Sequence, residues 1–294
     1  MRKSRNNKFY GGALAALLCA GVAAAVPATA SANAVPSVAK LVPAAMKAKG
    51  EITVAADASY PPDEYLGSDG KTVIGMDADL SKALGAAMGL KVNILNVGFD
   101  SIIPGMAAGR YQLGASSFTD TKAREKTVDF VDYASVGEAF YTRTQGGTNI
   151  KGIADLCGKS VAVEKGTTEQ QDATTQSKTC TKQGKQPVNV LPFPDQNGAN
   201  LAVASGRAQL GFADAPPVAY QIRKSGGKFK LVGKAFATAP YGIAVAKSSG
   251  LTKAVQAAMV HLIKNGTYSK IFAKWGISSF TIPASQVKIN GAIF

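Results

Sequence analysis

The sequence is poor in the residues that most often build catalytic and metal-binding sites. Its 294 residues include one histidine and three cysteines. His261 has no cysteine or acidic residue at a spacing typical of a metal site or a catalytic pair, and no nucleophile-elbow pattern occurs. Asp77 and Asp79 stand two apart at the start of a predicted helix, where capping is the expected role. We therefore expect no catalytic residue, no metal and no cofactor.

The three cysteines fall into two groups. Cys19 lies in the apolar N-terminal stretch, whereas Cys157 and Cys180 are the pair in the rest of the chain. An even pair in an exported protein predicts a disulfide bond. No C-x-x-C pattern is present, so two free thiols or a redox pair are the less favoured alternatives.

Long hydrophobic runs are also scarce, which argues against a membrane-spanning helix. The apolar stretch in residues 11–26 is short and rich in alanine. It follows a basic start and precedes two A-x-A patterns, so residues 1–34 are expected to be a signal peptide. The protein would then be exported, to an extracellular, cell-surface or periplasmic location.

Two further expectations concern the N-terminal region. Leu18 stands before Cys19 where a lipid-attachment motif has a small residue, so an ordinary leader cysteine is favoured over a lipid anchor. Residues 35–50 are rich in alanine, valine and proline, and we expect them to form a loose lead-in linker with at most one short helical turn.

Acidic residues are outnumbered, with 19 against 33 basic residues and a formal net charge of +14. Residues 1–34 hold four of the basic residues and none of the acidic ones, so the rest of the chain carries +10. Such a charge suits a nucleic-acid partner, but the lysines are scattered and are not interleaved with aromatic residues. We therefore expect no nucleic-acid partner, and attribute the charge to a secreted protein near an acidic envelope.

A polar loop within residues 109–124, GRYQLGASSFTDTKAR, is the strongest candidate for a binding site. The pattern predicts a turn, a strand over 111–115, a loop and the start of a helix. The loop carries the hydroxyls of Ser116, Ser117 and Thr119, and the guanidinium of Arg124 follows. A planar guanidinium with hydroxyl and N–H donors suits a small carboxylate. Taken alone, a surface loop with an exposed arginine would explain the same pattern.

The same unit occurs a second time. Residues 205–214 read SGRAQLGFAD, against AGRYQLGASS in residues 108–117, and the second copy ends in Asp214. Strand ends are where open α/β sheets place ligand groups. If the two units face each other, Arg124 would bind the carboxylate and Asp214 the ammonium of an α-amino acid. The alternative role for Asp214 is to cap the helix that follows it.

The order of several motifs resembles one known family. The stretch GRYQLGASSFTDTKAREKTVDF is similar to the signature of the family 3 extracellular solute-binding proteins, the polar amino acid receptors of ABC importers. Further matches are ITVAADASYPP, VIGMDADLSKALGAAMGLKV, GFDSIIPGMAAG, SVAVEKGTT, GFADAPPVAY and LIKNGTYSKIFAKWGI. The resemblance covers residues 51–277. It is specific for the family and far less specific for the ligand.

The resemblance implies an α/β fold of two lobes, the periplasmic-binding-protein-like fold of type II. Each lobe would be a mixed sheet flanked by helices. Lobe 1 would comprise residues 51–140 and 241–294, and lobe 2 residues 141–240. The chain would cross between the lobes in residues 128–143 and return in residues 239–246, and such a two-crossing hinge can close on a ligand.

The resemblance also assigns residues to the ligand. Tyr60 and Phe99 match positions that cover its aliphatic part. Thr168 would begin a helix aimed at its carboxylate, where free N–H groups and the helix dipole favour an anion. The simpler alternatives are that Thr168 belongs to a plain helix cap and that Phe99 is a core residue. Asp57 would assist Asp214 with the ammonium.

Three acidic residues depart from the family's pattern. Asp63 stands where relatives have a second aromatic residue, Glu64 follows it, and Glu164 occupies a position that is often apolar. Facing the ligand, these side chains would favour a basic or amide group. Otherwise Asp63 and Glu64 belong to a solvated loop, and Glu164 pairs with a lysine.

The expected function is that of an exported, monomeric receptor and not of an enzyme. It would bind a polar amino acid, with a basic or amide side chain favoured, between its lobes and deliver it to an ABC permease. One alternative is a cyclohexadienyl dehydratase-like enzyme on the same fold, with Glu164 as its acid. Another is a ligand-sensing partner of a membrane receptor. Product formation from prephenate or arogenate would distinguish the enzyme.

Overall fold

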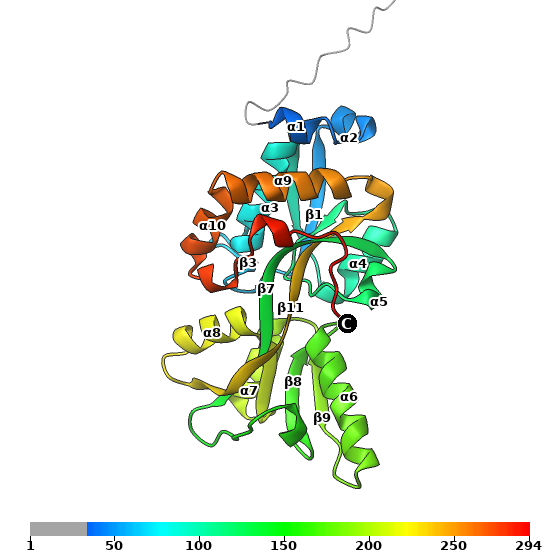
Figure 1. Cartoon of the computed structure of the whole chain (residues 1–294). Helices are drawn as coiled ribbons and strands as arrows, with labels where there is room; N and C mark the ends of the chain where they lie inside the picture. The colour runs from blue at the N-terminus through cyan, green and yellow to red at the C-terminus, as the bar shows by residue number, and fades with distance from the viewer. Residues whose placement is uncertain (1–33) are drawn as a thin grey trace, which may run out of the picture.

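The described residues form two lobes joined by two long strands. The computed structural model describes residues 34–294, so the predicted signal peptide and Cys19 lie outside the described residues. The lobes are stacked one above the other in Figure 1, with the joining strands running between them. This is the two-lobed α/β architecture that the sequence predicted. No helix within residues 34–294 is long and apolar enough to cross a membrane.

Lobe 1 is organised around the buried strand β1 (Glu51–Ala56). It pairs in parallel with β5 (Lys91–Asn96) on one side and with β6 (Leu113–Gly114) on the other. Its other elements are β2 (Ser59–Tyr60), β3 (Glu64–Leu66), β4 (Val73–Ile74), α3 (Met76–Met88), α4 (Phe99–Ala107), α9 (Thr252–Lys264) and α10 (Thr267–Trp275). Helix α4 begins at Phe99, shortly after β5 ends at Asn96, and Phe99 lines the gap between the lobes.

The crossings between the lobes are β7 (Val128–Arg143) and β11 (Phe229–Ala246). They pair antiparallel and link the strands of both lobes into one sheet, in the order β5-β1-β6-β11-β7-β10-β8-β9. The return crossing is longer than the predicted 239–246. Its register shifts around Phe236, where a side chain on Gly137 would clash with the Phe236 carbonyl oxygen. The hinge is therefore a two-stranded ribbon with an irregular centre.

Lobe 2 repeats the alternation of strand and helix. Its elements are η1 (Ile153–Leu156), β8 (Ser160–Glu164), α6 (Thr168–Lys182), β9 (Asn189–Phe193), α7 (Gln196–Ser205), β10 (Leu210–Asp214) and α8 (Ala215–Lys224). Strand β8 lies between β9 and β10, and both pairings are parallel. Parallel strands end at one edge of a sheet, so β8 and β10 deliver Glu164 and Asp214 to the same side.

The repeated GRxQLG motif has a structural reason. Gln112 in lobe 1 accepts a hydrogen bond from Thr53 N with its side chain, while its own N–H donates to the Thr53 carbonyl oxygen. Gln209 in lobe 2 makes the same pair of bonds with Ser160. Each glutamine thus continues the parallel pairing by one step just before its strand begins. This fixes where β6 and β10 start, and hence which residues stand at their ends.

The segment before β1 is not the loose linker that we expected. Residues 35–50 form α1 (Pro36–Ala39) and α2 (Ala44–Lys49), and Val38 and Val42 are buried in the core of lobe 1. Val35 N also donates to the carbonyl oxygen of Ala87. The alternation of small apolar residues and lysines hid this packing, because it has no clear helical period.

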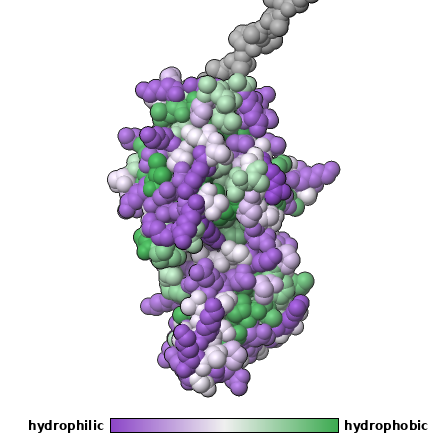
Figure 2. All heavy atoms as spheres, turned by 90° about the vertical axis from the view of Figure 1, so that its right-hand side faces the viewer, coloured by the Kyte–Doolittle hydropathy of each residue, from purple (hydrophilic) through white to green (hydrophobic). Residues whose placement is uncertain are grey.

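The last part of the chain also packs on lobe 1. After η3 (Ser278–Phe280) and η4 (Ala284–Gln286), residues 287–294 run along β7 and reach α5 (Lys122–Glu125). The sequence offered no role for this tail. On the face shown in Figure 2, hydrophilic residues cover most of both lobes and hydrophobic residues form small patches.

Cys157 and Cys180 form the predicted disulfide, which ties the end of η1 to the last turn of α6. The bond closes a loop with a sequence separation of 23 residues. Cys180 is fully buried in the core of lobe 2. The chain-entropy model gives such a cross-link a stabilising effect of about 3 kcal/mol.

The double variant Cys157→Ser/Cys180→Ser should therefore lose about 3 kcal/mol of unfolding free energy. Urea unfolding of the oxidised protein and of the variant measures this loss. Lys178→Ala, at an exposed position of the same helix, is the matched control. A midpoint that does not move in the double variant would contradict a stabilising bond.

Candidate functional site

A cleft between the lobes gathers all ten residues that the sequence analysis assigned to a ligand. Its lining consists of Asp57, Tyr60, Glu64, Phe99, Ser116, Ser117, Thr119, Arg124, Glu164, Thr167, Thr168, Glu169 and Asp214. The lining comes from strand ends and helix starts of both lobes, which is where open α/β sheets place their ligands.

The two serines are held in place by carboxylates of lobe 1. Ser116 Oγ accepts from Asp57 N at 2.9 Å and donates to Glu64 Oε1 at 3.0 Å. Ser117 has a left-handed backbone with φ of 50°, and its N–H donates to Asp77 Oδ2 at 2.8 Å. Asp77 therefore supports the loop instead of capping its own helix, where no side-chain cap bond is made.

Arg124 lies across the boundary between the lobes. Its Nη1 donates to the carbonyl oxygen of Thr119 in lobe 1 at 2.8 Å, and its Nη2 to that of Gly166 in lobe 2 at 3.1 Å. The guanidinium carbon lies 5.4 Å from the centre of the Phe99 ring. Thr121 caps α5 by accepting from Arg124 N. Two of five guanidinium donors are thus used by carbonyl oxygens, and the others can meet an anion.

Tyr60 and Asp214 form a direct bond between the lobes. The Tyr60 hydroxyl donates to Asp214 Oδ2 at 3.0 Å and accepts from Asp214 N at 2.9 Å. Asp214 precedes α8, yet its side chain makes no cap bond there, so the capping alternative does not describe it. Its carboxylate faces the cleft. Burial, reinforced by the nearby charge of Glu138, raises the pKa of Asp214 to about 8.

Lobe 2 supplies its groups at the start of α6. Thr167 caps the helix by accepting from Gln170 N, and Thr168 Oγ1 lies 3.4 Å from Thr119 Oγ1 across the cleft. Glu164 ends β8, and Glu169 is buried in the first turn of α6. Each of these two glutamates has one buried side-chain oxygen without a hydrogen-bond partner among the described residues.

Three residues of the lining were not assigned to the ligand from the sequence. Glu64 was weighed both as facing the ligand and as part of a solvated loop. It and Asp63 are buried, because the β2–β3 hairpin folds them against the loop of Ser116 and Ser117, named here the serine loop. Thr167 and Glu169 flank the assigned Thr168. The usable signal was an acidic residue directly after a GTT helix start, which ordinarily indicates only a favourable helix dipole.

The cleft is strongly acidic. Among the described lining residues are five carboxylates and one guanidinium. Burial raises the pKa of Glu164 and of Glu169 well above the usual value, with Asp57 and Asp214 respectively as the next largest causes. Such groups need positive partners, since an unpaired buried carboxylate is costly. Within residues 34–294 no three His, Cys, Asp or Glu side chains are arranged to hold a metal ion.

The fold and the cleft define a class. Two α/β lobes on a two-stranded hinge, with polar groups of both lobes facing one small cleft, are the architecture of a solute-binding protein that closes around its ligand. The chain belongs to the bacterial extracellular solute-binding proteins, family 3, which it matches over residues 52–278. Members of this family bind amino acids and work with ABC transporters, and this chain is an amino-acid-binding protein of that kind.

Its similarity to known proteins covers most of its length. The chain is 36% identical to the arginine-binding protein ArgT of Corynebacterium glutamicum over 244 residues, which are 83% of this chain and 80% of that protein. Among solved structures, an ancestral arginine-binding protein bound to arginine has a TM-score of 0.70 and 34% identity, covering 77% of this chain and 98% of that one.

A further structure bears on the enzyme alternative. It is the ancestral amino acid-binding protein AncCDT-1, described as a precursor of cyclohexadienyl dehydratase. Its TM-score is 0.70 and its identity 30%, and the match covers 79% of this chain and 97% of that one. ArgT, the ancestral arginine-binding protein and AncCDT-1 are thus all described as binding proteins.

The Tyr60–Asp214 bond should help to hold the lobes together. Tyr60→Phe removes the hydroxyl, so Asp214 Oδ2 and Asp214 N lose their hydrogen-bond partner. This loss should destabilise the closed form by about 1–3 kcal/mol. At a ligand concentration that half-closes the wild type, the variant should show a larger radius of gyration in small-angle X-ray scattering. Tyr111→Phe, within lobe 1, is the control. Equal scattering for Tyr60→Phe and wild type would rule out this role.

Proposed function

We propose that the protein is an exported receptor for a basic amino acid, with L-arginine as its ligand, and that it delivers this ligand to an ABC permease. The observation that carries the proposal is the surplus of carboxylates, five against one guanidinium, in the cleft between the lobes. Arginine brings two cationic groups and one carboxylate to this site. The description of close relatives as arginine-binding proteins supports the same ligand.

The carboxylate end of the ligand is assigned to Arg124. This guanidinium lies between the serine loop of lobe 1 and the start of α6, where Thr168 adds a backbone N–H at the positive end of the helix dipole. A bidentate pair between a guanidinium and a carboxylate is stronger than a neutral hydrogen bond. Thr119 adds a hydroxyl that faces Thr168.

The ammonium is assigned to Asp214. Asp214 is close enough to Arg124 to affect the pKa of that guanidinium. The ammonium and carboxylate of an α-amino acid are adjacent, so the groups that bind them must also lie near each other. Burial, and next the nearby charge of Glu138, raise the pKa of Asp214, and a bound ammonium would offset both effects. Glu169, the next carboxylate in the same part of the cleft, adds to the negative potential.

The side-chain guanidinium is assigned to Asp57 and Glu164. These carboxylates come from opposite lobes, at the ends of β1 and β8, and Glu164 has Asp57 as a cause of its raised pKa. Glu164 Oε1 has no partner among the described residues. A planar guanidinium can bridge two carboxylates, whereas the amide of glutamine would leave them without a counter-charge. Tyr60 and Phe99 would cover the aliphatic part.

This assignment explains how the ligand closes the protein. Each charged group of arginine would contact or lie near residues of both lobes, so the bonds are complete only when the lobes meet. The bonds of Tyr60 and Arg124 between the lobes add to the closed form. No covalent step is needed, and we propose a receptor and not a dehydratase. The monomeric state remains a prediction.

Calorimetric titration with the twenty amino acids tests the proposal directly. The protein is first unfolded and refolded to remove carried ligand. Arginine should bind at micromolar affinity or better, and glutamine about a hundredfold more weakly, because it leaves buried carboxylates unpaired. Arg124→Ala should abolish binding, with Arg110→Ala as the control. Arginine binding that survives in Arg124→Ala would refute the central assignment, and turnover of prephenate would favour the enzyme.

Arginine affinity should rise with pH. In the closed protein without a ligand, burial raises the pKa of Asp214 to about 8 and that of Glu138 to about 9, so both carry protons at pH 7. A bound ammonium favours the ionised form of Asp214, and the proton must leave on binding. One such group gives at most about a tenfold gain in affinity per pH unit below its pKa. Titrations at pH 6 and pH 8 in buffers of different ionisation enthalpy measure the proton release.

The stability of the ligand-free protein against unfolding should instead fall as pH rises. A carboxyl whose pKa is higher in the folded than in the unfolded chain binds extra protons when folded, so unfolding becomes easier as pH rises from about 4 to 8. The increase in melting temperature caused by arginine should therefore be larger at pH 8 than at pH 6. Proton uptake on binding, or an affinity that does not change with pH, would be inconsistent with this linkage.

A further inference from the structure

Residues 287–294, here named the strap, lie beyond the part of the chain that matches the family. In Figure 1 this segment descends from the helices of lobe 1, along β7, towards α5 and the gap between the lobes. Val287 is buried in the core of lobe 1 and anchors its beginning. The strap therefore connects the core of the lobe to the short helix that carries Arg124.

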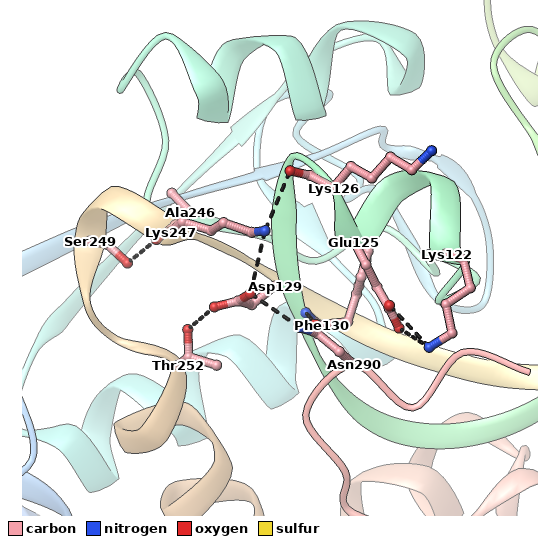
Figure 3. Close-up of polar contacts among 10 residues, drawn as sticks. All are labelled: Lys122, Glu125, Lys126, Asp129, Phe130, Ala246, Lys247, Ser249, Thr252 and Asn290. Carbon is pink, nitrogen blue, oxygen red and sulfur yellow. Dashed lines mark hydrogen bonds and ion pairs between the residues drawn. The ribbon is translucent and has the colours of Figure 1, made fainter.

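The strap pairs with the lobe 1 half of β7. Asp132 N donates to the carbonyl oxygen of Lys288 at 2.9 Å, and Asn290 N to that of Phe130 at 3.0 Å. Asn290 Oδ1 accepts from Phe130 N at 2.8 Å, and Asn290 Nδ2 donates to Asp129, as Figure 3 shows. Asn290 has a φ of 55°, a conformation that asparagine tolerates better than most residues. These bonds fix the direction of the strap.

Beyond Asn290 the strap holds both ends of α5. Lys122 N, at the start of α5, donates to the carbonyl oxygen of Phe294 at 2.9 Å. Ala292 N donates to Oε1 of Glu125, at its end, at 3.2 Å, and Glu125 also binds Lys122 (Figure 3). A helix of four residues has little stability of its own, because the cost of nucleation is not recovered. Its position therefore depends on what surrounds it.

We propose that the strap is a positioning element that aims the Arg124 guanidinium at the ligand carboxylate. Arg124 lies on α5 between the two residues that the strap binds, and its Nη1 reaches back to Thr119. A guanidinium recognises a carboxylate through two parallel bonds, so a small rotation of α5 weakens both. The strap does not line the cleft. This inference rests on the proposed function of the same cleft.

A close approach of the strap to β7 provides a point variant. A Cβ added to Gly291 would lie 2.0 Å from Asp132 Oδ2, so alanine must displace the strap or Asp132. Gly291→Ala therefore disturbs the contact between the strap and β7 without removing the strap. Gly152→Ala is the matched control, because that position has open space and an extended backbone. Asn290→Gly permits the left-handed backbone and removes only the side-chain bonds.

The experiment compares L-arginine with L-argininamide, whose neutral amide cannot form the charged pair with Arg124. Both are titrated into wild type, a chain that ends at Asn290, Gly291→Ala, Asn290→Gly and the controls Gly152→Ala and Ser285→Ala. Loss of strap contacts should weaken the binding of arginine about tenfold or more, which is the size expected for one misaligned charged bond. The binding of argininamide should weaken about twofold at most. The ratio of the arginine affinity to the argininamide affinity should fall accordingly.

Each outcome decides for or against the positioning role. Unchanged arginine affinity in the shortened chain, or an equal loss for arginine and argininamide, would overturn it, because general loosening of the lobe affects both ligands. If the shortened chain does not fold, the two point variants decide by the same ratio. Failure of the wild type to bind arginine would instead refute the proposed function.

Discussion

Carboxylates buried between the lobes outnumber the cations that can pair with them, and the rest of the structure depends on this imbalance. Asp57, Glu164 and Asp214 stand at the ends of three strands from two lobes, and Glu169 lies in the first turn of a helix. Closing the lobes removes these groups from water, which raises their pKa values and disfavours an empty closed cleft. A cationic ligand reverses that cost, so binding and closure become one process.

The hinge that joins the lobes is a paired ribbon with an irregular centre. Two antiparallel strands connect the lobes, and their register shifts near Phe236. Glu138 stands opposite both Phe236 and Asp214 in this ribbon, so a buried carboxyl lies where the strands of the lobes meet the crossing. Its pKa, raised to about 9 by burial and by Glu169, belongs to the same acidic environment as the cleft. A charge placed in the cleft therefore acts electrostatically on a carboxyl group of the hinge.

Both lobes contain the same local arrangement of a glutamine and the strand that follows it. In each, a glutamine of the GRxQLG motif extends the pairing of a parallel strand by one bond, and the strand that follows ends at the cleft. What differs is the residue type at that end: Ser116 and Ser117 in lobe 1, and Asp214 in lobe 2. Similar local geometry thereby presents neutral donors on one side and a negative charge on the other. The strap adds a feature of this chain, at residues outside the family match.

The sequence by itself determined most of the elements of the two lobes and the residue types at their ends. Strand and helix periodicity and the paired cysteines are encoded over a few residues. The repeated unit and the motif order predicted the family and ten of the thirteen residues that line the cleft. Tertiary structure alone decided the burial of Glu64, the bond of Tyr60 to Asp214 and the placement of residues 287–294 on α5. The physical reason is distance along the chain: Tyr60 and Asp214 are 154 residues apart, and no local period records which distant surface a polar side chain will meet.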